Sequence, residues 1–339
     1  MTTQRLTFID IARSISIILI VIYHYEPENS PDWYSSLNNI GISFRIPLLM
    51  FVSGYIYTMV KKPVKYRDFV LNKFKRLTVP YLFISTMVIC IKLLVEKDMF
   101  KDPVSISSFY EMFYLPSAGF FVWFIYTLFL VFLIIPFADT PRKLNIFLIL
   151  SLILLLIPID FPMLFCLFYL KKNLFYFVLG CFICAKANLK LIIDKIPAIA
   201  LFVFFTLVYG LKLITHASWL TPLIDLSLAV SGIFFILNIS MQIDRETNPI
   251  KPFFIKLSSY TYTIYLFHTT AEGFAKMISL KIPLENYLTP DFCFVFKAFF
   301  VITLGILVPV VIHKIVVSKS RLFSFLIGAK YLPKIALSK

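Results

Sequence analysis

The sequence has little charge and lacks the motifs of several large enzyme classes. Only 15% of its 339 residues are charged, whereas 60% are hydrophobic. It contains no Walker A loop, no G-x-S-x-G nucleophile motif, no dinucleotide-binding glycine pattern and no His-Glu-x-x-His zinc pair. No histidine precedes an aspartate by five residues, so the usual glycerolipid acyltransferase motif is absent as well. These absences argue against the common soluble nucleotide-binding, hydrolase and metalloprotease classes.

Few residues are available to bind a metal ion. The chain has five cysteines and four histidines, and its Cys181-x-x-Cys184 pair falls within a predicted apolar helix. Buried structural thiols are expected there, because a redox or metal site would need an exposed dithiol or two further ligands. We therefore expect no metal, while a proton-transfer role for one or two histidines stays open. The four histidines are His24, His216, His268 and His313.

Long apolar runs fill the chain, and mean hydropathy is +0.87. A soluble domain of this size does not need so much apolar surface, so we predict an all-α integral membrane protein with about ten transmembrane helices. The first run is read as a retained span and not a signal peptide, because it carries an acid and an arginine and lacks a small-residue cleavage site. The predicted spans are 8–25, 42–60, 77–95, 118–138, 146–160, 173–187, 196–214, 220–241, 260–278 and 292–315, and part of 161–172 is left open as re-entrant.

Positive charge is distributed unevenly between the two sides of the predicted membrane domain. The net charge is +15, and the loops on one side hold most of the 33 lysines and arginines. This positive-inside pattern predicts a multi-pass protein of the cell membrane with both termini in the cytoplasm. It indicates attraction to anionic membrane lipids or phosphorylated cofactors and argues against nucleic acid as a partner.

The chain shows no repeat of 20–50 residues, no low-complexity region and no Gly/Ser linker. The simplest organisation is one multi-pass membrane domain over 1–315. The remaining segment, 316–339, is a basic cytoplasmic tail that could lie on the inner leaflet as an interfacial helix.

The first hydrophobic segment carries two ionisable residues, Arg13 and His24, eleven residues apart. Eleven residues make about three helical turns, so both side chains project from one face, about 16 Å apart along the axis. Asp10 lies on the same face, three residues before Arg13. Charged groups at membrane depth usually face a polar cavity, which makes these residues functional candidates. The alternative is interfacial, with Arg13 reaching one membrane surface and His24 the other.

The Arg13-x10-His24 pattern resembles the first-span motif of membrane acyltransferase family 3, the multi-pass acyltransferases that modify surface carbohydrates. Four further segments resemble motifs of that family in the same order. They are a proline-led run with Ser-Gly-Tyr at 47–55, a basic run before Pro-Tyr at 73–81, a Trp-Phe motif at 121–124, and a Ser-Tyr run ending in His at 259–268. The resemblance extends from about residue 8 to 270.

Two positions depart from the family pattern. Arg45-Ile46-Pro47 stands where His-x-Pro is frequent, so a histidine role in the second span is in doubt and Arg45 receives no role. Lys73-x-x-Arg76 replaces Arg-x-x-Arg, which keeps the charge but loses one bidentate guanidinium.

The resemblance implies transfer of an acyl group, usually acetyl from acetyl-CoA, to a hydroxyl of an extracytoplasmic glycan or lipid-linked sugar. Arg13, Lys73 and Arg76 would then bind the acyl-CoA phosphates at a cytosolic helix start. His24 would deprotonate the acceptor hydroxyl or briefly carry the acyl group. Membrane anchoring alone is the alternative for the basic run.

Four further residues are weaker candidates for substrate binding or support. Ser53, beside Gly54, fits close helix packing better than nucleophilic attack. Trp123 is either a packing ring or a ring that stacks on a ligand. His268 and Glu272 lie one helical turn apart, as a base and its orienting acid would, or as an interfacial pair.

Two functions of other classes remain as alternatives. A transporter or flippase for a lipid-linked or acylated sugar would use Arg13 and His24 to line a pathway, but the two matching halves common in transporters are not evident. A structural assembly subunit would leave the intramembrane arginine and histidine unexplained.

Overall fold

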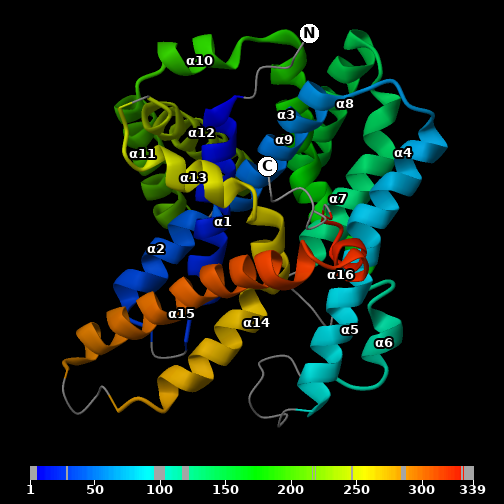
Figure 1. Cartoon of the computed structure of the whole chain (residues 1–339). Helices are drawn as coiled ribbons and strands as arrows, with labels where there is room; N and C mark the ends of the chain where they lie inside the picture. Colours follow the sequence, from blue (N-terminus) through cyan, green and yellow to red (C-terminus); the bar gives the residue numbers. More distant parts are fainter. Residues whose placement is uncertain are drawn as a thin grey trace. The chain divides into compact units, whose positions relative to one another are not determined.

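The computed structural model describes residues 6–27, 30–94, 104–116, 122–215, 217, 219–245, 247–283, 288–329 and 331. Helices account for 80% of the structure, and no described residue lies in a β-strand (Figure 1). The all-α prediction is therefore confirmed. Contacts within the chain define two compact units, which alternate along the sequence. Unit 1 is Met1–Lys61, Leu144–Pro158 and Phe175–Pro309, and unit 2 is Lys62–Lys143, Ile159–Leu174 and Val310–Lys339.

Among the described residues, six helical segments are long and apolar enough to cross a membrane, and a seventh is obtained if two helices bent by 76° form one span. This supports a multi-pass membrane protein, whereas the count of about ten and the cytoplasmic termini remain predictions. Three predicted spans meet helices of a different kind. The apolar helix Trp123–Phe137 is short, α8 (Pro141–Leu156) has only 16 residues, and α14 (Thr261–Leu280) carries buried polar groups. The six segments are Thr7–His24, Asp32–Val60, Tyr66–Leu94, Leu164–Lys186, Thr221–Ile243 and Pro290–Val317, and the bent pair is Leu189–Lys195 with Ala198–Ile214.

Unit 1 is built around α1 (Thr7–His24), whose apolar side chains Phe8, Ile11 and Ile17 are fully buried. Isoleucine, phenylalanine and alanine recur along most of its circumference, as expected for a helix surrounded by other helices. The helices that pack against it are α2 (Asp32–Ile42), α3 (Arg45–Val60), α12 (Thr221–Ile243), α13 (Lys251–Ser258) and α14 (Figure 1).

Helix α3 meets the part of α9 (Leu167–Lys186) that belongs to unit 1 through two glycines. A Cβ added at Gly54 would lie 2.0 Å from the carbonyl oxygen of Phe177, and one at Gly180 would lie 2.1 Å from that of Phe51. The two backbones are therefore in direct contact, as small residues allow in membrane helices. Ser53 donates a hydrogen bond of 2.7 Å to the carbonyl of Leu49, one turn earlier in its own helix. These contacts agree with the packing interpretation of this segment.

Unit 1 also contains α10 (Leu189–Lys195), α11 (Ala198–Ile214) and most of α15 (Pro290–Ile312). Helix α11 packs against α12 but buries none of its residues. Its side chains are almost all apolar and many are exposed, Ile214 to 73%. An apolar surface of this kind suits contact with lipid.

Unit 2 places α4 (Tyr66–Lys73), the π-helical turn η1 (Phe74–Thr78) and α5 (Val79–Leu94) in one continuous helical segment. The hydroxyl of Tyr81 is buried and donates to the carbonyl of Met112, 2.6 Å away, which ties α5 to the segment after α6 (Ser108–Glu111). The described part of this unit also contains α7 (Trp123–Ile134), η4 (Ile135–Phe137), η5 (Leu164–Cys166), η7 (His313–Val317) and α16 (Arg321–Leu326).

The predicted tail, 316–339, contains α16, a helix of six residues with Leu322 and Phe325 exposed. Residues 330 and 332–339 of that tail lie outside the described residues. An interfacial position for the tail remains a prediction.

Candidate functional site in unit 1

His24 ends α1 and stands against a second histidine from α14. Their ring centroids are 4.9 Å apart at an interplanar angle of 65°. His24 is exposed, although Val21 before it and Tyr25 after it are buried. His268 is 0% exposed and lies behind the His24 ring. The structure thus brings together two candidates that the sequence gives only on separate helices, and it leaves His24 accessible to a small molecule.

Hydrogen bonds of His268 indicate how its protons are arranged. Its Nδ1 lies 2.8 Å from the carbonyl oxygen of Tyr265 and 3.1 Å from that of Ile264. Carbonyl oxygens only accept, so Nδ1 carries the proton and Nε2 keeps a lone pair in the neutral ring. A buried neutral imidazole of this kind can hold the neighbouring ring in place without adding charge.

Glu272 lies one turn beyond His268 and is buried between α15 and α1. A Cβ on Gly305 would come within 2.8 Å of the Glu272 Cγ and 3.1 Å of a Val21 methyl carbon, so the glycine provides the space for this side chain. The Oε1 atom of Glu272 has no hydrogen-bond partner among the described residues. Because buried polar atoms are normally satisfied, this oxygen is available to a water molecule or a ligand group. A pairing of His268 with Glu272 as base and orienting acid remains a prediction.

Arg13 lies near the opposite end of α1, where it is hydrogen-bonded to α13. Its Nη2 donates to the carbonyl oxygen of Ser258 at 2.5 Å and lies 3.3 Å from a carboxylate oxygen of Asp10. The Ser14 hydroxyl adds a bond of 2.7 Å to the carbonyl of Phe254. The Arg13 side chain keeps 28% of its surface exposed, so part of the guanidinium can still meet a ligand. Arg13 and His24 belong to one unbroken helix, as their spacing requires.

Arg45, which receives no role from the sequence pattern, is also a residue of this site. It begins α3, is only 7% exposed, and places its Cζ 3.3 Å from the centroid of the Tyr23 ring. It also lies within range of direct electrostatic interaction with His24. The signal that could have identified it was present, since Arg45 is a charged residue at the start of a long apolar run.

The other predicted donor-binding residues belong to unit 2. The ammonium of Lys73 lies 3.5 Å from the centroid of the Phe132 ring, a close cation–π contact, whereas Arg76 is exposed in the turn η1. Trp123 stacks on Tyr169 with centroids 3.9 Å apart and planes 16° from parallel, so packing occupies one face of its ring. Phe121 of the Trp-Phe motif and His216 lie outside the described residues.

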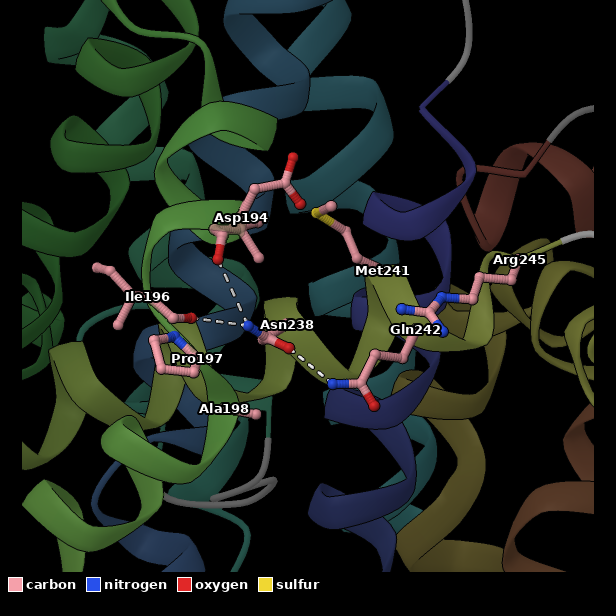
Figure 2. A pocket seen from close by; sticks show the side chains of 9 residues that line it. Asp194, Ile196, Pro197, Ala198, Asn238, Met241, Gln242 and Arg245 are labelled. Atoms are coloured by element: carbon pink, nitrogen blue, oxygen red, sulfur yellow. Dashed lines mark hydrogen bonds between the residues drawn. The ribbon is translucent and has the colours of Figure 1, made fainter.

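A separate hollow of about 460 Å³ lies in unit 1, where α10, α11 and α12 meet. Figure 2 shows that Asn238 closes this corner, since its amide nitrogen donates to the carbonyl of Ile196 at 2.9 Å and its oxygen accepts from Gln242 at 2.9 Å. None of the predicted site residues lines it. Its amide groups stabilise the bend, so we assign it no ligand.

No cluster of three histidine, cysteine or acidic side chains suited to a metal ion occurs within the described part of the chain. The His24 site itself presents imidazole, carboxyl and guanidinium groups.

A model described as an acyltransferase domain, that of the acyltransferase 3 family, matches residues 6–314. The chain belongs to the acyltransferase 3 family. No curated protein matches it, and no solved structure does. Its family and the several described helices long enough to span a bilayer make it a multi-pass membrane acyltransferase.

Proposed function

We propose that this acyltransferase moves an acetyl group from acetyl-CoA to a hydroxyl of a glycan, or of its lipid-linked precursor, outside the cell membrane. The observation that carries the proposal is the His24–His268 pair, with rings 4.9 Å apart and only His24 exposed. An accessible imidazole held by a second neutral ring is suited to move a proton during acyl transfer.

In the proposed reaction the acceptor hydroxyl gives its proton to His24 while its oxygen forms a bond to the thioester carbonyl carbon. The carbonyl π electrons move to oxygen, and a tetrahedral oxyanion results. Collapse of the oxyanion breaks the carbon–sulfur bond, and the thiolate takes the proton back from His24. The products are the O-acetylated glycan and CoA thiol. His268 acts on this reaction through the position of the His24 ring.

The two ends of α1 give the substrates separate places in this proposal. Arg13 lies near the end that the charge pattern assigns to the cytoplasm, and its partly exposed guanidinium would contact a CoA phosphate. His24 lies about 16 Å further along the axis, a distance that the extended pantetheine arm can cover. For Lys73 and Arg76, which belong to unit 2, contact with the CoA phosphates stays a prediction. The acceptor would reach His24 from the outer surface.

The test uses purified protein in liposomes, acetyl-CoA labelled in the acetyl group, and alkali-deacetylated surface polysaccharide from the cells that carry the gene. We expect base-labile label in the polysaccharide with the wild type and with His313→Ala, a histidine of unit 2. We expect a loss of about 10²–10⁴ in rate with His24→Gln, because an amide cannot take up the proton. Near-normal acetylation by His24→Gln would refute the catalytic assignment, and passage of sugar across the bilayer without label transfer would favour a transporter.

A further inference from the structure

The guanidinium of Arg45 is a buried positive charge that the proposed reaction has not yet used. It is 7% exposed at the start of α3. Among the described residues Arg45 forms no ion pair within 4.0 Å, and Glu26 interacts with it electrostatically. Burying a cation without a paired acid is unfavourable in general. Such a group is normally kept for a ligand or a reaction.

The contacts of Arg45 hold it beside His24 without neutralising it. Its Cζ lies 3.3 Å from the Tyr23 ring centroid, and the Tyr23 and His24 rings meet edge to face at 5.4 Å. Its own carbonyl accepts a bond of 3.0 Å from the Ser16 hydroxyl, which fixes the start of α3 against α1. An aromatic face attracts a cation but carries no net charge. The charge of Arg45 interacts electrostatically both with Glu26 and with His24, so its field acts on the imidazole.

From this arrangement we infer that Arg45 stabilises the oxyanion formed beside His24 during acyl transfer, an inference that rests on the proposed function. When the acceptor oxygen adds to the thioester carbon, negative charge develops on the former carbonyl oxygen. A guanidinium donates N–H groups in a fixed fork and keeps its charge, so it can bind that oxygen as the charge appears. When the thiolate leaves, the electron pair on the oxyanion reforms the carbonyl π bond. Arg45 itself therefore neither gains nor loses a proton.

A structural role for Arg45 would not require its charge. If its task were only to cover the Tyr23 ring, a neutral side chain of similar length would serve and would avoid the cost of burying a cation. A role in holding substrate before reaction would change KM, whereas oxyanion stabilisation acts in the transition state and changes kcat.

The experiment compares wild type with Arg45→Gln and Arg45→Lys in the labelled-acetyl assay, with acetyl-CoA binding and thermal melting measured on the same samples. The matched control is Arg245→Gln, which changes an exposed arginine of unit 1 that lines the separate hollow. We expect Arg45→Gln to lower kcat about 10²–10³-fold with unchanged acetyl-CoA affinity. Arg45→Lys should lose less, because it keeps the charge, and the control should match the wild type.

The inference is overturned if Arg45→Gln keeps the wild-type kcat, if only KM rises, or if the lysine and glutamine variants lose kcat equally. Should Arg45→Gln not fold, Arg45→Lys decides alone. A partial loss of kcat at unchanged acetyl-CoA affinity then supports the inference, whereas a wild-type kcat or a change confined to KM overturns it. Absence of label transfer by the wild type would refute the proposed function itself, which separates the two failures.

Discussion

The contact between α3 and α9 makes Gly54→Ala a demanding test of the structure. The added Cβ would lie 2.0 Å from the Phe177 carbonyl oxygen, 2.8 Å from its carbonyl carbon and 3.2 Å from its Cα. Ordinary contacts of a Cβ begin at 3.4 Å, so the helices would have to separate by roughly 1.4 Å at this point. All three obstructing atoms are backbone atoms, and no side-chain rotation can relieve the clash.

The expected cost follows from two opposing effects. Replacing a helical glycine by alanine alone favours the helix by about 1 kcal/mol. Forcing an extra methyl group into a packed contact costs about 1–3 kcal/mol, and a backbone-to-backbone contact belongs at the upper end. The net destabilisation is then about 2 kcal/mol. The matched control is Gly210→Ala in α11, where nothing lies within 4 Å of the added atom.

The assay is thermal unfolding of the detergent-solubilised protein, followed by loss of helical circular dichroism. We expect Gly54→Ala to melt several degrees below the wild type and Gly210→Ala to melt at or slightly above it. Equal melting temperatures for the two variants would show that α3 and α9 do not meet through Gly54.

Three further predictions concern the site and the membrane. Arg13→Ala should weaken acetyl-CoA binding by about 1.5–3 kcal/mol in titration calorimetry, because a charge-assisted contact is lost. Arg76→Ala should weaken binding in the same way. Wild-type affinity in both variants would refute the proposed cytosolic phosphate site. A single cysteine at Asp32 should react with an impermeant maleimide added outside the cell, whereas one at Lys65 should not, and strong external labelling at Lys65 would reverse the topology. Exchange of His24 for glutamine should leave acetyl-CoA affinity unchanged while transfer is lost, and a parallel loss of donor binding would indicate a folding defect.

Composition and spacing predicted the helical class and the geometry of α1 well. Arg13 and His24 lie on one unbroken helix because the segment between them is continuously apolar. The span count was harder to predict from hydropathy alone. Helix α14 has the 20 residues expected of a span, and His268 and Glu272 are buried in it, so its place among the spans stays a prediction. A hydropathy window averages over such residues and does not register which face they occupy.

The composition of the site depended on tertiary contacts that the sequence pattern does not encode. The pairing of His24 with His268 requires α1 and α14 to meet, although they lie at opposite ends of the chain. Arg45 was visible as a charged residue at the start of an apolar run, but its place beside Tyr23 depends on how α3 packs on α1. Spacing along one helix gives a common face, whereas the partner on that face is set by packing.

The exposure of α11 affects which substitutions this chain can accept during evolution. It buries none of its residues, and exposed side chains such as Phe202, Leu207 and Ile214 recur along it. Exchanges among leucine, isoleucine, valine and phenylalanine there should be close to neutral, since no cavity opens and the helix stays apolar. Selection on α11 therefore acts on its overall solubility in hydrocarbon and hardly on residue identity. A deep mutational scan should find it permissive to apolar exchange and intolerant of charge, in contrast to α1, where even small changes of shape are felt.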